Sequence, residues 1–462
     1  MQLSLEQIRY WMGAQFAASP NAASTASGYS IDSRTIQPGD IFFAVRGERF
    51  DGHDFVEAAL QAGAVAAVIA AAQLSRYTSD AIHRQLLLVE DPLAAMQRLA
   101  SSVRRHWGKR VIGITGSAGK TTTKEAVAQV LQSHFQVHKS QGNLNNHYGL
   151  PLQMLRIQPE HEVAVLEMGM SNAGEIAALC KIAAPDWGVV TNVGTAHAEN
   201  FNDGQAGIAR AKYELIASLP RHGTAILNCD DSYVRQFGRD FPGTVIYFGT
   251  GVCADPRAEA ISSLGADGTR VTVQAGEKRM QVELRLLGEH NVHNALAGIA
   301  VGLASGIPLE ECATALQSLA PPEKRGQTLE IRGATLLNDC YNCNPPALRA
   351  MVDTLLTLPA QRRIVIAGEM LELGPDGPQL HCESGEYMGK RGIDVVVGVR
   401  GEAASIVAGA KSAGVKTTLF VATPEDAGAW LRENLQPGDA VLLKASRGVR
   451  LERALEVLQR EE

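Results

Sequence analysis

The sequence has no long apolar run. No stretch approaches the roughly 18 consecutive apolar residues that a membrane-spanning helix needs, and residues 1–6 carry neither a basic segment nor an apolar core. We therefore expect no membrane span and no secretory signal. An excess of positive charge is absent as well, since the formal net charge is −6. Nucleic acid is thus not expected as the main partner.

Cysteine is sparse and shows no pairing pattern. The chain has seven cysteines among 462 residues, an odd number that is widely spread, which predicts reduced thiols and a cytoplasmic protein. Cys340 and Cys343 form one C-x-x-C, and no second C-x-x-C accompanies them. His381 and Cys382 are candidates to complete a zinc site there. A metal or redox role for the C-x-x-C is the less favoured interpretation.

Internal repeats and low-complexity segments are also absent, so a chain of this length is expected to fold as about two to four domains. Short apolar runs alternate with helical patterns, which predicts an α/β protein with doubly wound, mostly parallel sheets. We expect a small α/β domain at 1–85, a central domain at 86–318 and a Rossmann-like α/β domain at 319–462. Alternating apolar and polar positions in 269–287 predict an antiparallel hairpin in the central domain.

A glycine-rich segment is the most informative motif. Residues 113–122 read Gly-Ile-Thr-Gly-Ser-Ala-Gly-Lys-Thr-Thr, after an apolar run and before a helical pattern. A turn between strand and helix presents backbone N–H groups to phosphates. In such a P-loop Lys120 reaches the terminal phosphates and the Thr121 hydroxyl binds Mg²⁺. Ile114 stands where the usual motif has a glycine, five residues before Gly119. The segment predicts a nucleoside triphosphate site and disfavours a purely structural turn or a dinucleotide site.

Three further residues of the central domain are candidates for chemistry. Glu167 lies in the strand-like run 163–169, where a carboxylate suits Mg²⁺ or is a solvated strand end. His197 follows the next run and is either a ligand or an ordinary surface histidine. Lys212 lies in a helical pattern and, by its sequence context alone, is a surface lysine.

Two polar segments suit a substrate. The segment 143–149 contains Asn143, Asn145 and Asn146, whose amides pair with neutral polar groups; an asparagine-rich turn is the alternative. The turn 444–447, Lys-Ala-Ser-Arg, follows the last strand-like run. It suits an anionic group, or is a helix-start turn with solvated charges.

These motifs resemble those of the Mur ligases of bacterial cell-wall synthesis along nearly the whole chain. The T-G-x-x-G-K-T form of the P-loop is similar to theirs, and residues 32–34, 38–44 and 51–53 resemble the family's UDP-sugar domain. Within the family, three segments resemble the branch that adds D-alanyl-D-alanine; they are Gly142–Asn146, Asp339–Pro345 and Gly368–Gly374. The D-N-P-R motif of the branches that add lysine or diaminopimelate is absent.

The resemblance implies an ATP-dependent amide ligase. It implies that D-alanyl-D-alanine is joined to UDP-N-acetylmuramoyl-tripeptide through an acyl phosphate, with ATP and Mg²⁺, by a cytoplasmic monomer. The first domain would hold the UDP-sugar, the central domain ATP, and the last domain the amino substrate and part of the nucleotide.

The family's functional residues map onto this sequence position by position. The catalytic residues implied are Lys120, His197 and Lys212. The ATP contacts implied are Thr115, Gly116, Ser117, Ala118, Gly119, Lys120, Thr121, Thr122, Asn294, Arg325 and Asp339. The substrate contacts implied are Ser33, Arg34, Asn143, Asn145, Asn146, Tyr341, Asn342, Lys444, Ser446 and Arg447. The Mg²⁺ ligands implied are Thr121, Glu167, His197 and Lys212, the last one as a carbamate.

The sequence departs from the family pattern in three places. Ala445 replaces a glycine, which disfavours a positive φ there. The junction before the last domain reads Lys324-Arg325-Gly326, a reordered form of the family's Gly-Arg pair. Cys340 and Cys343 replace common serine and alanine, which argues against a metal role for them.

Two alternative functions stay open on the sequence. The first is another Mur-type or folylpolyglutamate-type amide ligase, which a panel of substrates separates. The second is a nucleotide-gated binding protein, which would hydrolyse ATP slowly and without dependence on an amine.

Overall fold

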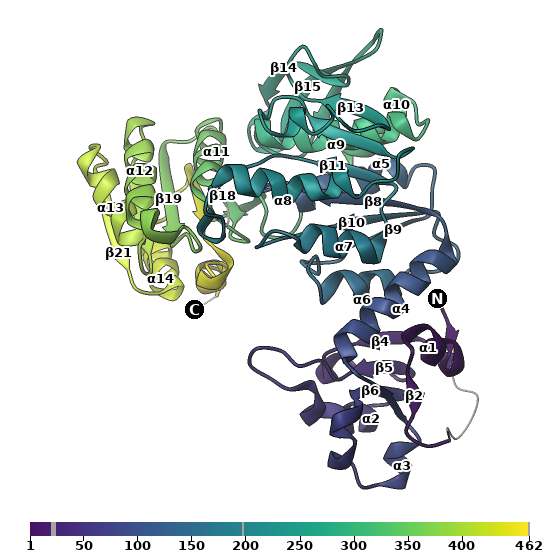
Figure 1. Cartoon of the computed structure of the whole chain (residues 1–462). Coiled ribbons are helices and arrows are strands. Elements are labelled where there is room, and N and C mark those ends of the chain that lie inside the picture. Colours follow the sequence, from purple (N-terminus) through teal and green to yellow (C-terminus); the bar gives the residue numbers. More distant parts are fainter. Residues whose placement is uncertain (20–24, 196–197, 461–462) are drawn as a thin grey trace.

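A computed structural model describes residues 1–19, 25–195 and 198–460. Figure 1 shows three α/β bodies along the chain, coloured purple to blue, blue to green, and light green to yellow. The largest sheet of each body has five or six strands. In the described residues no helix is long and apolar enough to cross a membrane. The predicted mixed α/β class with parallel sheets is confirmed.

The N-terminal body is built on a five-stranded sheet. Its strand order is β2-β7-β6-β5-β4, parallel except for β2. The strands are β2 (Gln15–Phe16), β4 (Gly28–Ser30), β5 (Asp40–Phe43), β6 (Ala66–Ala70) and β7 (Leu86–Val89), with a separate pair β1 (Leu3–Ser4) and β3 (Thr25–Ala26). The helices are α1 (Leu5–Met12), α2 (Val56–Gln61) and α3 (Asp80–His83).

Helix α4 (Pro92–Trp107) lies between the first two bodies (Figure 1). It begins where the Asp91 carboxylate caps two backbone N–H groups and Pro92 supplies a preset φ, and it ends at Gly108 with φ 67°. The buried Arg104 guanidinium donates to the carbonyls of Ala183 and Ala184 at 2.9 and 3.0 Å. These bonds fix α4 on the central body.

The central body has a fully parallel sheet in the order β13-β12-β11-β8-β10-β9. Adjacent residues of β8 face opposite cores, since Val111 belongs to one hydrophobic cluster and Ile112 to another. Apolar side chains on both faces explain the unbroken apolar runs in the sequence. The strands are β8 (Arg110–Thr115), β9 (Val137–Lys139), β10 (Val163–Glu167), β11 (Trp187–Val190), β12 (Thr224–Asn228) and β13 (Thr244–Phe248).

Helices cover both faces of this sheet. They are α5 (Lys120–Leu131), α6 (Gly149–Leu155), α7 (Glu175–Ala183), α8 (Gln205–Ala217), α9 (Glu289–Ala304) and α10 (Leu309–Gln317). The predicted hairpin forms as β15 (Thr269–Ala275) and β16 (Lys278–Leu284), and β14 (Arg257–Ser263) extends it to three antiparallel strands.

The C-terminal body carries a six-stranded sheet in the order β17-β18-β22-β19-β20-β21, antiparallel only at β17. The strands are β17 (Gln327–Ile331), β18 (Ala334–Asp339), β19 (Arg362–Gly368), β20 (Val395–Val399), β21 (Thr417–Val421) and β22 (Asp439–Lys444). The helices are α11 (Pro345–Leu356), α12 (Gly377–Lys390), α13 (Ala403–Ser412), α14 (Pro424–Asn434) and α15 (Glu452–Gln459).

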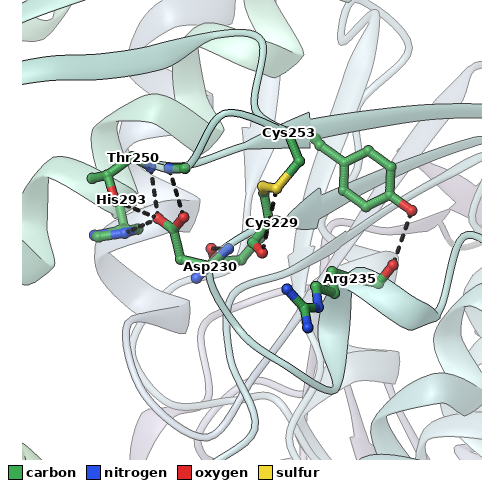
Figure 2. The surroundings of a disulfide bond; sticks show 9 residues. Cys229, Asp230, Arg235, Thr250, Cys253 and His293 are labelled. Atoms are coloured by element: carbon green, nitrogen blue, oxygen red, sulfur yellow. Dashed lines mark hydrogen bonds and ion pairs between the residues drawn. A yellow bond between two sulfur atoms is a disulfide. The ribbon is translucent and has the colours of Figure 1, made fainter.

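The prediction that all thiols are reduced is wrong for one pair. Cys229 and Cys253 form a disulfide (Figure 2), and the free cysteines are Cys180, Cys312, Cys340, Cys343 and Cys382. Cys229 follows β12 and Cys253 lies beyond the end of β13. Parallel pairing of these two strands brings the two cysteines together, which spacing along the chain does not reveal.

Candidate active site

The P-loop turn between β8 and α5 needs glycine at two positions. Gly116 has φ 155° and Gly119 has φ 80°, values that side-chain-bearing residues rarely adopt. A Cβ at Gly116 would overlap the Thr191 hydroxyl, and one at Gly119 would overlap the Asn294 amide. The loop therefore packs tightly against the end of β11 and the start of α9.

Asn192, just beyond β11, holds the backbone of this turn. Its carbonyl accepts the Ser117 N–H at 3.0 Å, and its side-chain oxygen accepts the Ala118 N–H at 2.8 Å. The neighbouring Thr191 hydroxyl donates to the Ala118 carbonyl at 2.6 Å. Asn192 thus occupies two backbone N–H groups of the turn, those of Ser117 and Ala118, which the P-loop motif predicts to bind phosphate. No motif in the sequence indicated this residue.

Lys120 begins α5, and its ammonium donates to the Gly116 carbonyl at 2.7 Å. Burial lowers the pKa of Lys120, Glu167 acts to raise it, and the charge of Arg325 lowers it further. Lys120 therefore feels the charge of both a carboxylate and a guanidinium. A second cation beside Lys120 suits a multiply charged anion such as a triphosphate.

The Mg²⁺ ligands predicted on the P-loop helix and on β10 lie together. The Thr121 hydroxyl donates to one Glu167 oxygen at 2.8 Å, and the Asn145 amide donates to the other at 2.8 Å. Ser140, another residue that the sequence did not indicate, accepts the Glu167 N–H at 3.1 Å. Glu167 is only 2% exposed. A buried carboxylate beside a hydroxyl is the hard-oxygen environment that Mg²⁺ prefers, so these residues fit the ion.

The remaining ligand predictions have different outcomes. His197 lies outside the described residues, and within the described ranges no group of three His, Cys, Asp or Glu side chains gathers as a metal site.

Lys212 is buried, so the prediction of a surface lysine is wrong. Helix α8 packs against β8 and β11, and Lys212 lies on the buried side with Ala211 and Leu215. Burial, and then the charge of Lys120, lower the pKa of Lys212 well below its ordinary value.

A cavity of about 320 Å³ opens beside the P-loop. Its lining comes from the ends of three strands and from the first turns of α9; the residues are Thr191, Asn192, Asn228, Phe248, Glu289, His290, His293 and Asn294. The Asn294 oxygen accepts the Thr123 hydroxyl at 3.0 Å, and its NH₂ donates to Asn291 at 2.9 Å.

Several pocket residues were missed from the sequence. In the segment Glu289–Asn294, the sequence predicts only Asn294 as an ATP contact. His290 and His293 of the same segment also line the cavity. Their spacing of three on a helix was the available signal. Asn228, at the end of β12, gave no signal beyond its position.

In the C-terminal body, Asp339 and Lys444 end the paired strands β18 and β22. The Lys444 ammonium donates to Asp339 and, at 3.0 Å, to the Asn342 carbonyl. Burial acts to lower the pKa of Lys444, but Asp339 outweighs it and the pKa is raised. Lys444 is therefore a buried cation held by Asp339, and not one of the solvated charges that the helix-start alternative predicts.

The turn after β22 joins the motif segments of the last body. The Ser446 hydroxyl accepts the Leu371 N–H at 2.9 Å and donates to the Cys343 carbonyl at 3.3 Å. The exposed Arg447 pairs with Glu452. Segments 339–345, 368–374 and 444–447, far apart in sequence, thus meet at one end of the sheet.

Ala445 does not require a positive φ, since it is absent from the positive-φ residues of the described chain. Its methyl group is fully buried. A Cβ built on Gly368 would lie 2.5 Å from the Ala445 Cβ. The missing side chain at Gly368 therefore makes room for Ala445.

At the junction before the last body, the Arg325 guanidinium lies 3.9 Å from the centre of the Tyr341 ring. This is a cation–π contact, and the Tyr341 N–H donates to the Lys324 carbonyl at 3.1 Å. Because the charge of Arg325 acts on Lys120, the junction and the P-loop belong to one region.

Of the predicted UDP-sugar contacts, Arg34 is exposed and Ser33 is half-buried. Ser33 and Arg34 lie in a short 3₁₀ turn, Ser33–Thr35, and the Arg34 side chain is 86% exposed and paired with Asp32 at 2.6 Å. Of the three asparagines, only Asn145 reaches the acidic site. Asn143 is exposed, and Asn146 accepts the Gly149 N–H at 2.9 Å at the start of α6.

Cys340 and Cys343 of the C-x-x-C are buried, and they lack the features of a reactive cysteine pair. Burial raises the pKa of the Cys340 thiol well above its usual value and that of Cys343 to about 12, so neither supplies a thiolate at pH 7. His381 accepts the Met370 N–H at 2.9 Å and donates to the Gly377 carbonyl at 2.7 Å. Both of its ring nitrogens are therefore engaged within the fold.

Three family profiles match successive parts of the chain. They are described as Mur ligase family, catalytic domain, at residues 25–106; Mur ligase middle domain, at 114–302; and Mur ligase, glutamate ligase domain, at 324–447.

Individual relatives match over nearly the full length. The UDP-N-acetylmuramoyl-tripeptide–D-alanyl-D-alanine ligase of Bacillus subtilis is 36% identical over 92% of this chain and 91% of its own length. The ligase of the same name from Escherichia coli is 32% identical over 94% of each chain. The chain is also similar to the crystal structure of MurF from Acinetobacter baumannii, with a TM-score of 0.88, 28% identity and coverage of 100% and 99%. MurF from Thermotoga maritima in complex with ADP matches with a TM-score of 0.81, 32% identity and coverage of 93% and 96%.

Proposed function

The chain belongs to the UDP-N-acetylmuramoyl-tripeptide–D-alanyl-D-alanine ligases of the Mur ligase family, and from this membership we propose how its residues carry out the reaction. The protein is an ATP-dependent ligase that adds D-alanyl-D-alanine to UDP-N-acetylmuramoyl-tripeptide in peptidoglycan synthesis. This identity replaces both alternatives, a different amide ligase and a nucleotide-gated binding protein.

The proposed reaction has two steps. The tripeptide carboxylate attacks the γ-phosphorus of ATP, which releases ADP and forms an acyl phosphate. The amine of D-alanyl-D-alanine then attacks the acyl carbon and expels phosphate. An amine and a carboxylate do not condense readily in water, so the carboxylate oxygen must first become a leaving group. Positioning and charge neutralisation are the main work of the protein.

The contact between Thr121 and Glu167 beside Lys120 carries this proposal. Lys120 neutralises charge on the phosphates, and the glycine turn that leads into α5 orients them. Thr121 and Glu167 are the residues that would hold Mg²⁺, with His197 as a proposed third ligand. When bound, Mg²⁺ supplies positive charge to the phosphate oxygens.

Lys212 is proposed as a carbamate. Its lowered pKa favours the neutral amine, which is the form that adds CO₂. The resulting carbamate is an anion in place of an ammonium, and it relieves the repulsion between Lys212 and Lys120.

ATP is proposed to lie with its adenosine part in the cavity at Asn294 and its phosphates on the P-loop. The volume and the mixed polar and aromatic lining of the cavity suit a small ligand. Arg325 lies at the junction before the last domain, and its electrostatic influence on Lys120 supports a contact between Arg325 and ATP. The main role proposed for Asp339 is to hold Lys444. We assign Lys444 to the positioning of residues 342–343.

The substrate assignments follow the division into three domains. We keep 1–85 for the UDP-sugar, with Ser33 and Arg34; 86–318 for ATP; and 319–462 for D-alanyl-D-alanine. The amino-substrate residues proposed are Tyr341, Asn342, Ser446 and Arg447, and Asn143, Asn145 and Asn146 are assigned to the peptide. The cytoplasm remains the proposed location, because ATP and the nucleotide-sugar substrate are cytoplasmic compounds, and the monomer stays a prediction.

The test is phosphate release by the purified protein. We expect release only with UDP-N-acetylmuramoyl-tripeptide, ATP, Mg²⁺ and D-alanyl-D-alanine together, and none when the amine is replaced by lysine, diaminopimelate or glutamate. Release without any amine, at the same rate, would contradict the assignment.

A further inference from the structure

A disulfide joins an exposed loop to a buried residue beside the nucleotide cavity. Cys229 is buried directly after β12, whereas Cys253 is exposed in the loop 249–255 after β13. Figure 2 shows the sulfur bridge lying next to Asp230. The bridge therefore fixes the far end of this loop to the strand end that carries Asp230.

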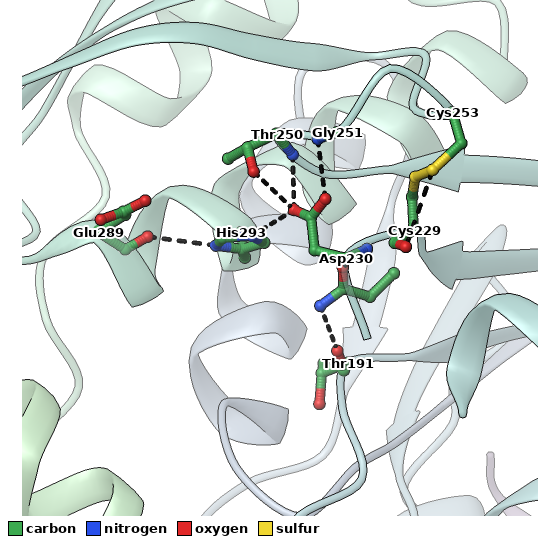
Figure 3. Close-up of polar contacts among 9 residues, drawn as sticks. Thr191, Cys229, Asp230, Thr250, Gly251, Cys253, Glu289 and His293 are labelled. Carbon is green, nitrogen blue, oxygen red and sulfur yellow. Dashed lines mark hydrogen bonds and ion pairs between the residues drawn. A yellow bond between two sulfur atoms is a disulfide. The ribbon is translucent and has the colours of Figure 1, made fainter. Parts of the chain in front are cut away.

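Asp230 is the anchor of the near end of the same loop. Its carboxylate accepts the Thr250 N–H at 2.6 Å, the Thr250 hydroxyl at 3.0 Å and the Gly251 N–H at 2.8 Å. The same carboxylate accepts the His293 Nε2–H at 2.8 Å (Figure 3). Burial acts to raise the pKa of Asp230, but these donors outweigh it and lower the pKa, so the group is a carboxylate.

The loop is shaped to fit this carboxylate. A Cβ on Gly249 would lie 2.6 Å from one Asp230 oxygen, and a Cβ on Gly251 would lie 2.8 Å from the other. Either side chain would push the backbone away from Asp230. Glycine at both positions lets the two N–H groups reach the carboxylate.

Asp230 in turn holds two walls of the cavity. His293, which it fixes through Nε2, lines the cavity from α9. Asn228, also in the lining, accepts the Asp230 N–H at 2.9 Å and donates to the Thr191 carbonyl at 2.8 Å. The loop, the carboxylate and the cavity wall thus form one hydrogen-bonded unit, drawn in Figure 3.

We propose that the Cys229–Cys253 disulfide is a redox-sensitive brace of this cavity, so that the oxidised protein binds adenine nucleotides more tightly than the reduced protein. The inference rests on the proposed placement of ATP in the cavity. It adds regulation by a dithiol, a chemical class that reduces accessible disulfides in the cytoplasm.

The reduction transfers two electrons. A thiolate of the dithiol attacks the exposed Sγ of Cys253, the S–S bond breaks, and the electron pair leaves on Cys229 Sγ, which takes up a proton. The second thiol of the reductant then attacks the mixed disulfide and releases Cys253 as a thiol. The protein gains two hydrogens as thiols, and the dithiol becomes a disulfide.

Reduction weakens binding through conformational freedom. Once the bond to Cys229 is broken, the tip of the loop keeps its hydrogen bonds to Asp230, and the Asp255 N–H still donates to the Tyr247 carbonyl at 2.7 Å, but the residues between these anchors open more often. Each opening removes donors from Asp230 and frees the His293 ring. A nucleotide then has to order these groups when it binds, and that ordering lowers its affinity.

The experiment measures ADP binding to the full chain by calorimetry before and after treatment with dithiothreitol. Alkylation of the denatured protein monitors the redox state, because five thiols should react before reduction and all seven after it. We expect reduction to raise the Kd for ADP by about fivefold, the low end of coupling between two protein sites.

Two serine variants sharpen the test. Cys253→Ser should bind ADP with the weaker affinity whether or not dithiothreitol is present. Cys382→Ser, which removes a free cysteine on α12, should keep the full response to reduction.

The outcomes separate the brace from the nucleotide assignment. Equal affinity in both redox states, or seven reactive thiols before reduction, would overturn the brace and leave the proposed function standing. Absence of ADP binding in both states would overturn the nucleotide assignment and the brace with it.

Discussion

The Thr121 hydroxyl donates a 2.8 Å hydrogen bond to the Glu167 carboxylate, although the two residues are 46 positions apart. Thr121 lies in the first turn of α5 and Glu167 ends β10, so the contact depends on the glycine turn that leads into the helix. The pair places a hydroxyl and a buried carboxylate beside Lys120. This is the centre on which the proposed phosphoryl transfer depends.

Removal of the Lys120 ammonium should abolish most turnover. We expect Lys120→Ala to lower kcat for phosphate release by about 10²–10³-fold, because a preorganised charge at the phosphates is lost. Phosphate release assayed at saturating substrates measures this change. Lys181→Ala, at an exposed position on α7, is the control and should keep normal turnover. Equal turnover in both variants would remove Lys120 from the phosphate site.

We expect Lys212 to provide a negatively charged carbamate to the site. Lys212→Ala should lose activity about a hundredfold, the size of effect expected for one electrostatic group in the site. Formate or acetate should restore part of that loss, because either anion can replace the carbamate in the space left by the side chain. The rate is measured against acetate concentration, with chloride at equal ionic strength as the control. A variant that acetate does not rescue at any concentration would argue for a purely structural lysine.

His138 should make the fold acid-sensitive. Burial and the neighbouring His161 lower its pKa from 6.5 to about 4, so the unfolded chain binds a proton on this ring at a pH where the folded chain does not. Stability therefore falls as the pH falls from about 6.5 toward 4, and this group accounts for about 2 kcal/mol between pH 7 and pH 5.

Urea unfolding at pH 7 and pH 5 checks this prediction. The loss of unfolding free energy between the two pH values should be smaller in His138→Gln than in the unaltered protein. His222→Gln, at an exposed position, should leave that loss unchanged. If His138→Gln shows the full loss, the acid sensitivity arises elsewhere.

Gly368 and Ala445 should behave as a coupled pair. Gly368→Ala should destabilise the protein by about 1–3 kcal/mol, since its Cβ meets the Ala445 methyl group in a closed core. Ala445→Gly should recover much of that loss in the double variant. Unfolding free energies of the four proteins give the coupling. Additive effects would show that the two Cβ positions do not compete.

Predictions from the sequence succeeded where the chemistry is local. The glycine turn, the strands around it and the carboxylate at the end of β10 each carry a signal within a few residues. The alternation at 269–287 predicted the β15–β16 hairpin for the same reason, because a period of two is visible over a short window.

The failures concern relationships between distant segments. The sequence context of Lys212 predicts a surface residue, because its neighbours do not reveal which face of α8 packs on the sheet. Asn192 holds the P-loop from another strand, and Cys229 meets Cys253 only because β12 and β13 are adjacent. Such contacts follow from strand order, which one sequence does not contain.

The most direct test of the central claim follows oxygen atoms. UDP-N-acetylmuramoyl-tripeptide labelled with ¹⁸O in its terminal carboxylate is incubated with the protein, ATP, Mg²⁺ and D-alanyl-D-alanine, and the released phosphate is analysed by mass spectrometry. If the carboxylate attacks the γ-phosphorus, the phosphate carries one ¹⁸O for each amide formed. Phosphate without ¹⁸O, released alongside amide product, would contradict the acyl-phosphate route.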